Sequence, residues 1–278
     1  MAFWIRAATL TIGKKTYDLD GLDFSFEVPF DASEELPVAT VTVTNLSERT
    51  RAGIKKNKQV ILNAGYEGDV GCILIGNVVG LRHRHSGTEW TTTLTVQPCA
   101  DKVLSKHINK TYKTDMKAKE LVKDLLNIYD VEVKKFELQK NVAYARGRVC
   151  KGKLIKVLEE IVVDECKSRL FTLPTGEIAI TKKNGGLKSP VKLTGRSGLL
   201  RADEEKEMFA LQKKQDGEEK KEDNYISRSC LLNYGISAAA IIKIKSEDLN
   251  GKFIVEKGSH KGSLTGEWKT EMQLKPYG

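Results

Sequence analysis

The sequence predicts a mainly β protein of the α+β class, in which two similar antiparallel β-barrel domains flank a small α+β module. Short apolar–polar alternations occupy both ends of the chain, and helical periodicity is confined to the middle. A ten-residue pattern also occurs twice, once near each end of the chain. The predicted domains are 1–100, 101–188 and 189–278.

The first hundred residues contain short strand-like runs separated by turn residues. The expected strands are 5–12, 39–44, 60–64, 72–75, 78–81 and 90–96. Gly13, Lys14 and Lys15 predict a hairpin turn after the first strand. Many short strands with such spacing are typical of an antiparallel barrel or sandwich.

The middle of the chain predicts two helices. The apolar residues of the first, over 116–129, recur at helical spacing: Ala118, Leu121, Val122, Leu125 and Tyr129. Thr114 or Asp115 is its expected N-cap. The second, over 153–166, has one stripe: Leu154, Val157, Leu158, Ile161, Val162 and Glu165. A strand at 131–133 and a hairpin over 169–181 complete this small α+β module.

The last third returns to β character from Val191. The expected strands are 225–232, 241–245, 252–256 and 268–274. They are preceded by the charged stretch 203–223, which holds nine acidic and five basic residues and is expected to be a solvated loop or a frayed helix.

The repeated pattern is Glu-Trp-x-Thr-x-(Leu or Met)-x-(Val or Leu)-x-Pro, at 89–98 and again at 267–276. Alternate positions share one face of a strand, so Trp90, Leu94, Trp268 and Met272 are expected core anchors. Upstream, 76–79 corresponds loosely to 251–254. The pattern predicts a duplicated β domain, and three such chains would present six similar barrels in a pseudo-sixfold ring.

Composition excludes several classes of protein. Hydrophobic residues make up 40% of the 278-residue chain, which is typical of soluble globular proteins. No apolar run approaches the roughly 18 residues that span a bilayer, so we expect no membrane insertion. The first fifteen residues do not form a convincing secretory signal. The net charge of +9 permits an anionic partner without requiring one.

Cysteine and histidine spacing predicts neither a metal site nor a disulfide framework. Five cysteines are scattered along the chain and are expected to be reduced and mostly buried: Cys72, Cys99, Cys150, Cys166 and Cys230. His83 and His85 would share one strand face, where they could hold an ion, but exposed histidines between Arg82 and Arg84 are the expected reading. Whether they hold an ion stays open.

Two sequence patterns could indicate catalysis, and neither is complete. Residues 147–153 match part of a phosphate-binding loop, yet Leu154 stands where a magnesium-binding Ser or Thr belongs. Cys230 and His260 could pair as nucleophile and base, but their surroundings match no protease signature. We therefore expect no enzyme, and no catalytic, cofactor-binding or metal-binding residue.

Basic charge is concentrated in 102–156, which holds fifteen Lys or Arg and six Asp or Glu. This segment could face nucleic acid or another anionic partner, or it could be a solvated helical surface. No aromatic residues interleave with its lysines as stacking platforms would.

Nearly the whole chain resembles the tail hub proteins of bacteriophages and related injection systems. These include the late control protein D group of contractile tails and the base of type VI secretion spikes. The matching stretches are 41–47, Ile54, 60–66, 75–76, 225–233, Gly235, 241–246, 251–255, His260 and 268–270. The motifs are strand patterns without a catalytic signature.

The resemblance implies a structural hub of a phage tail or phage-tail-like particle. Such a hub is a homotrimeric ring that joins the sixfold tail tube to a threefold spike or tail tip. Expected partners are the tail tube protein, a spike or tail-tip protein, and the tape measure and baseplate wedge proteins, with DNA only as cargo in the lumen. The particle would assemble in the bacterial cytoplasm, and a contractile or a non-contractile tail both remain open.

Two alternatives remain. The first is a standalone binding protein whose basic middle module, 102–156, contacts nucleic acid or an anionic cell-wall polymer. The second is a cell-wall hydrolase that uses Cys230 and His260.

Overall fold

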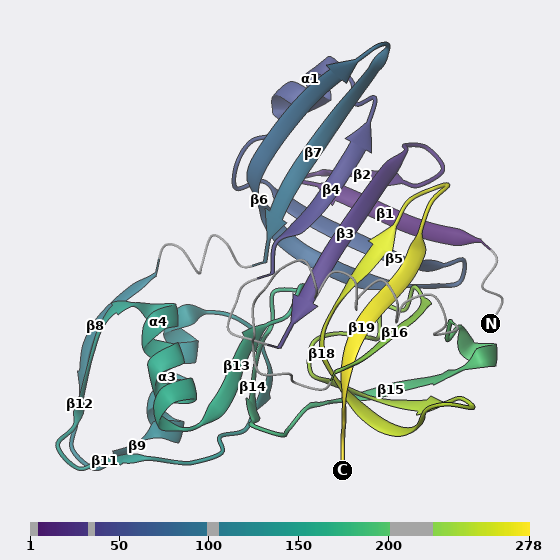
Figure 1. Ribbon diagram of the computed structural model, residues 1–278. Helices are drawn as coiled ribbons and strands as arrows, with labels where there is room; N and C mark the ends of the chain where they lie inside the picture. The colour runs from purple at the N-terminus through teal and green to yellow at the C-terminus, as the bar shows by residue number, and fades with distance from the viewer. Residues whose placement is uncertain (1–4, 33–36, 99–105, 201–224) are drawn as a thin grey trace, which may run out of the picture.

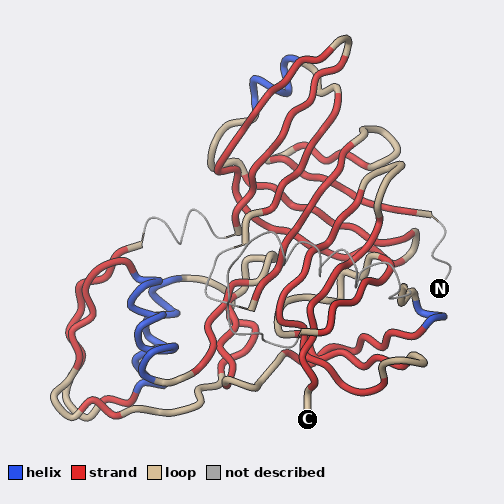
Figure 2. Tube along the Cα trace, in the orientation of Figure 1, coloured by secondary structure: helices blue, strands red, loops and turns tan. Residues whose placement is uncertain are grey.

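Strands dominate the computed structural model, which describes residues 5–32, 37–98, 106–200 and 225–278 (Figures 1 and 2). The predicted class, mainly β within α+β, is confirmed. Within these ranges, no helix is long and apolar enough to cross a membrane. The charged stretch 203–223 and Cys99 lie outside the described residues, so the expectations for them stay predictions.

The N-terminal β region contains seven strands and one short helix in its described part. They are β1 (Arg6–Ile12), β2 (Lys15–Asp18), β3 (Phe24–Asp31), β4 (Ala39–Thr44), α1 (Glu48–Gly53), β5 (Gln59–Tyr66), β6 (Asp69–Ser86) and β7 (Glu89–Gln97). The predicted first hairpin is confirmed as β1–β2. The two strands expected at 72–75 and 78–81 are one long strand, β6, which a bulge between Val78 and Gly80 bends without interrupting it.

The middle module contains short strands around two helical segments. They are β8 (His107–Tyr112), β9 (Met116–Lys117), α3 (Ala118–Tyr129), β10 (Val133–Phe136), β11 (Ala143–Tyr144), β12 (Arg148–Lys153), α4 (Leu154–Glu159), the π-helix η1 (Glu160–Glu165), β13 (Ser168–Thr172) and β14 (Ile178–Lys182). Its strands form three small sheets separate from the large one.

Both helix predictions for this module need correction at their ends. Helix α3 begins two residues late because Met116 and Lys117 pair with β11, and Lys117 is its N-cap in place of Thr114 or Asp115. The second helix becomes a π-helix after Glu159. Both apolar stripes are buried as predicted, except that Glu165 accepts a hydrogen bond from the Tyr144 hydroxyl.

The C-terminal β region comprises β15 (Leu187–Thr194), the 3-10 helix η2 (Gly195–Ser197), β16 (Ile226–Leu231), β17 (Ala240–Lys245), β18 (Asn250–Gly262) and β19 (Trp268–Pro276). Strand β18 is much longer than the strand predicted at 252–256. His260, which follows the end of that predicted strand, lies within β18.

The two β regions share a single twelve-stranded sheet. Its order is β15-β17-β18-β3-β4-β7-β6-β5-β1-β2, and β19 pairs with both β18 and β16. In Figure 1 the purple strand β3 lies beside the yellow strands β18 and β19, and β1 and β5 cross behind β3 and β4. The sheet folds over itself, so residues of β1, β3, β4, β5, β6 and β7 enclose one apolar core. A second core lies in the C-terminal region and a third in the middle module.

Candidate functional site: the seam between the two β regions

Strand β3 forms the seam, because it pairs with β4 of its own region and with β18 of the other. The seam register runs from Phe26 opposite Gly262 to Asp31 opposite Lys257. Phe26 lies in the N-terminal core, whereas Phe30, four residues later, lies in the C-terminal core. This strand was not among those predicted from the sequence, and its two ladders join the two β regions in one continuous sheet.

Trp268 ties the regions together from the opposite direction. It belongs to β19, yet it packs in the N-terminal core and is only 5% exposed. Its indole Nε1 donates a hydrogen bond of 3.1 Å to the carbonyl of Gly65, and its ring meets Phe26 edge-on at 5.6 Å. The expected anchoring role of Trp268 is confirmed, although the core it anchors belongs to the other region.

Glu256 connects the middle module to the seam. A bulge between Val255 and Lys257 leaves Glu256 outside the β18–β19 ladder. Its carbonyl accepts a hydrogen bond of 2.8 Å from the Ala32 backbone N–H. Its carboxylate accepts two hydrogen bonds from the Arg169 guanidinium, at 2.7 and 3.2 Å. Because Arg169 lies on β13, one bulged residue joins all three parts of the chain.

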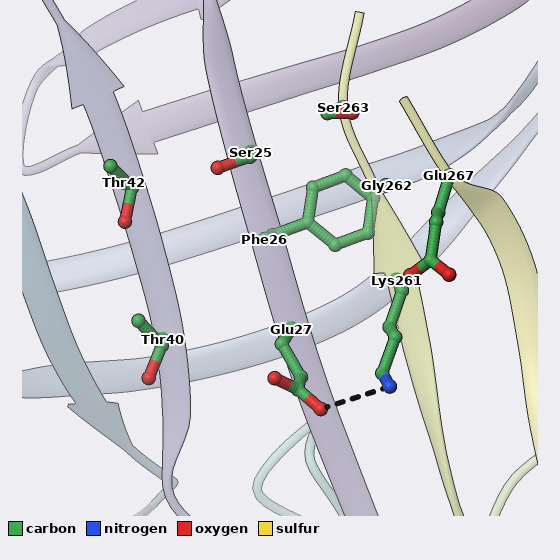
Figure 3. Close-up of a pocket in the computed structure, with 9 residues that line it drawn as sticks. All are labelled: Ser25, Phe26, Glu27, Thr40, Thr42, Lys261, Gly262, Ser263 and Glu267. Carbon is green, nitrogen blue, oxygen red and sulfur yellow. Dashed lines mark ion pairs between the residues drawn. The ribbon is translucent and has the colours of Figure 1, made fainter. Parts of the chain in front are cut away.

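A shallow groove of about 350 Å³ follows the outer face of the seam (Figure 3). It is lined by Ser25, Phe26, Glu27, Thr40, Thr42, Lys261, Gly262, Ser263 and Glu267. Lys261 lies 3.5 Å from Glu27 and 2.9 Å from Glu271. Burial alone would raise the pKa of Glu271, but hydrogen bonds from Lys269 and Lys261 hold it below its ordinary value. The groove is lined mainly by hydroxyls and ion-paired side chains.

The duplication is visible in the strand pairing. Strands β4-β7-β6-β5 and β16-β19-β18-β17 have the same order, and every pair within them is antiparallel. His83 lies opposite Thr92 with Nδ1 3.0 Å from the hydroxyl, and His260 lies opposite Thr270 at 2.9 Å. Both long strands also bulge at the equivalent residue, Val79 in one and Glu256 in the other. The four-stranded unit is therefore repeated residue for residue around the hairpin.

The shared register corrects the predicted alignment of 76–79, and the repeat does not extend beyond the four strands. Counted from the shared register, 77–78 corresponds to 254–255, so the expected match of 76–79 with 251–254 is wrong by two residues. Beyond the four strands the regions differ, since β1 is antiparallel to β5 whereas β15 is parallel to β17.

Trp90 is not the core anchor that the repeat predicts. It is 36% exposed near the tip of the β6–β7 hairpin, beyond the edge of the core. The Arg51 guanidinium lies 4.1 Å from its ring centroid, and His85 stacks on it at 4.6 Å. The other predicted anchors, Leu94 and Met272, are buried.

Cys230 and His260 do lie in one row, on either side of Thr270. Burial raises the pKa of the Cys230 thiol to about 12 and lowers the pKa of His260 to about 4. The thiol is therefore protonated and the imidazole neutral at neutral pH, with both side chains at most 2% exposed. A nucleophile needs the opposite, an accessible thiolate beside its base.

The remaining sequence candidates lie apart from one another. In the 147–153 motif, 148–153 forms β12 in an antiparallel ladder with β8, a geometry unlike a phosphate-binding loop. His83 bonds to Thr92 while His85 stacks on Trp90. Within the described ranges, no group of three or more His, Cys, Asp or Glu is placed to hold a metal ion.

Five of the fifteen cations in the basic segment 102–156 form ion pairs within the described residues. The pairs are Lys110–Asp124, Lys134–Glu177, Lys135–Glu137, Arg148–Glu160, Arg148–Glu165 and Lys156–Glu159. This pairing reduces the charge that the segment presents to an anionic partner.

Solved structures share this fold over nearly the whole chain. The tail protein from Neisseria meningitidis MC58 has a TM-score of 0.65 at 11% identity, with 98% of this chain and 97% of that chain covered. The 43 kDa tail protein of prophage MuSo2 from Shewanella oneidensis gives 0.65 at 10% identity, with 98% and 97% covered.

A third similar structure comes from a secretion system. It is the E. coli c3393 protein, a type VI secretion component described as structurally similar to T4 bacteriophage tail proteins gp27 and gp5. Its TM-score is 0.62 at 13% identity, with 97% of this chain and 77% of that chain covered. No family model and no curated protein matches the sequence. The chain thus has the fold of phage tail proteins, as the sequence resemblance predicted.

Proposed function

We propose that this chain is a structural subunit of a phage tail or phage-tail-like particle, where three copies form a hub ring. The ring joins a sixfold tail tube to a threefold spike or tail tip. The observation that carries the proposal is the repeated four-stranded unit with its shared register, bulge and His–Thr pair. Three chains bearing two such units present six similar surfaces.

The links across the seam suit a subunit that must carry mechanical load. A pseudo-sixfold ring needs its two units held at a fixed angle within each subunit. The β3–β18 ladder and the buried Trp268 link the two units, and the Arg169–Glu256 pair fastens the middle module to the C-terminal unit. We expect the two units of such a subunit to move together under load.

We place the contacts between subunits on sheet faces more than on strand edges. Within the described residues, the sheet ends at β2, which has only four residues, and at β15, which carries Lys188, Pro190 and Lys192. It also ends at β16, whose free side is partly paired with the backbone of 198–200. Short edges with Lys and Pro resist pairing with another strand. The groove of Figure 3, whose floor lies on the seam, is the face we assign to a neighbouring protein.

The proposal assigns no catalysis to the chain, which is supported by the protonated, buried Cys230 and neutral His260. The neighbours are a tail tube protein and a spike or tail-tip protein, with the tape measure and baseplate wedge proteins as further partners. The ring belongs to the particle and assembles in the bacterial cytoplasm.

Native mass spectrometry of the purified chain over a range of concentrations tests the ring. The expected species is a trimer of about 93 kDa, three times the 31.0 kDa chain. A dimer, a tetramer, or a monomer at every concentration would contradict the proposal.

A further inference from the structure

A second concave surface lies away from the seam, between the β1–β2 hairpin and α1. This pocket has a volume of about 330 Å³. It is lined by Ile12, Lys14, Lys15, Tyr17, Arg49, Thr50, Gly53, Ile54 and Lys58. We call it the cationic pocket.

Four cations and no carboxylate line the cationic pocket: Lys14, Lys15, Arg49 and Lys58. Within the described part of the chain, none of the four forms an ion pair. By contrast, Lys261 and Lys269 beside the seam both have carboxylate partners. Four like charges around one small volume repel one another, so the pocket attracts an anionic group.

Two of the cations are held in place by the fold. The Lys58 side chain lies across the turn at Gly13, where an added Cβ would come within 2.5 Å of the Lys58 Cε. Gly13 has a φ of +64°, which glycine adopts without strain. The Lys15 ammonium donates a hydrogen bond of 3.2 Å to the Thr50 hydroxyl on α1. Fixed cations lose little side-chain entropy when they bind.

The accessible floor of the pocket is the half-buried Tyr17 ring with the aliphatic parts of the lysines, since Ile12 and Ile54 are almost fully buried. Ile12 and Ile54 are each 5% exposed. The Tyr17 hydroxyl is buried and has no hydrogen-bond partner within the described residues. A ligand on the surface does not reach this enclosed hydroxyl, so the contact that Tyr17 offers to a ligand is its ring.

We propose that the cationic pocket binds an acidic protein segment that carries a bulky apolar side chain. Carboxylates pair with the rim cations, and the apolar side chain packs on the Tyr17 ring and the aliphatic parts of the lysines. A nucleic-acid backbone would satisfy the rim but leave the apolar floor uncovered, which favours a protein segment. The inference holds whether or not the chain forms a ring.

A suitable probe is a fluorescein-labelled peptide with the sequence of residues 203–211, which has four acidic residues beside Met208, Phe209 and Leu211. Binding is measured by fluorescence anisotropy with the full chain. To prevent the chain's own copy from competing, the full chain carries four neutralising changes: Asp203→Asn, Glu204→Gln, Glu205→Gln and Glu207→Gln.

The pair Arg49→Gln and Lys58→Gln should weaken peptide binding at least about tenfold, since two rim charges are lost. The matched control, Lys55→Gln with Lys56→Gln, removes equal charge from exposed neighbours that do not line the pocket, and should change binding less than about twofold. Circular dichroism melting curves verify that both variants fold.

Three outcomes would overturn the inference. They are no peptide binding, equal losses in both double variants, and full affinity of a peptide with Met208, Phe209 and Leu211 replaced by alanine. Competition by a thymidine oligonucleotide of equal charge that matches the unlabelled peptide would assign the pocket to nucleic acid instead.

Discussion

The β6–β7 and β18–β19 hairpins share a register, a bulge and a His–Thr pair but lie in different surroundings. Trp268 is buried against Gly65 and Phe26 of the other region, whereas Trp90 projects past its core and contacts Arg51 and His85. His260 is buried and His83 is exposed, although both bond to an equivalent threonine. A repeated strand pattern therefore predicts pairing, while the elements packed around it decide burial.

The difference arises from β3. This strand covers β18 through its pairing with 257–262, and no described strand covers β6 in the equivalent way. The β18–β19 hairpin, which lies beside β3, is therefore buried at Trp268, whereas the tip of the β6–β7 hairpin is exposed at Trp90.

The largest effect is expected for Trp268→Ala. The change leaves a cavity in the N-terminal core and an unpaired Gly65 carbonyl, and should lower the free energy of unfolding by about 3–5 kcal/mol. Urea denaturation followed by circular dichroism measures it. A loss below 1 kcal/mol would show that the seam does not depend on this residue.

His260 should make stability depend on pH. Burial lowers its folded-state pKa from 6.5 to about 4. The neutral, folded form is therefore fully favoured above about pH 6.5, and up to about 3 kcal/mol is lost as pH falls toward 4.

The dependence is measured as the difference in unfolding free energy between the protein and His260→Gln at several pH values. Comparison with His83→Gln provides the control, since His83 is exposed. Parallel stability curves for the protein and His260→Gln between pH 6.5 and 4 would contradict the assigned burial.

Arg169→Met should cost an intermediate amount, about 1–3 kcal/mol, because it leaves the partly buried Glu256 carboxylate without its charged partner. A double-mutant cycle with Glu256→Gln isolates the coupling between the two side chains. Additive effects of the two changes would show that the middle module is held by other contacts.

The smallest effect is expected for Trp90→Ala. Its contacts with Arg51 and His85 are solvent-exposed, so the loss of unfolding free energy should stay below about 1 kcal/mol. A loss as large as that of Trp268→Ala in the same urea assay would mean that the two copies are equally buried.

Sequence reasoning recovered local structure where periodicity was clear. The alternation at 39–44 and the stripe from Ala118 to Tyr129 predicted β4 and the buried face of α3. The β3 run, with Phe24, Phe26, Val28 and Phe30 on one face, had the same signal, although Pro29 within it is unusual for an inner strand. Pro29 is tolerated because β4 pairs only with 24–27.

The seam itself could not be predicted from local patterns. Nothing near Glu256 indicates a bulge, and its partner Arg169 lies 87 residues away. The cationic pocket likewise combines 14–17 with 49–58, which become neighbours only when β1 pairs with β5. The basic segment 102–156 was the more conspicuous charge signal, but sequence alone could not show that five of its cations are paired within the module.

We propose that the two equivalent β units of each chain build a trimeric, pseudo-sixfold ring. Electron cryomicroscopy of the assembled ring, reconstructed without imposed symmetry, is the decisive measurement. We expect three subunits around one axis and six similar β lobes that alternate between the two units of each chain. A ring with another number of subunits, or one in which only one unit of each chain lines the axis, would contradict this proposal.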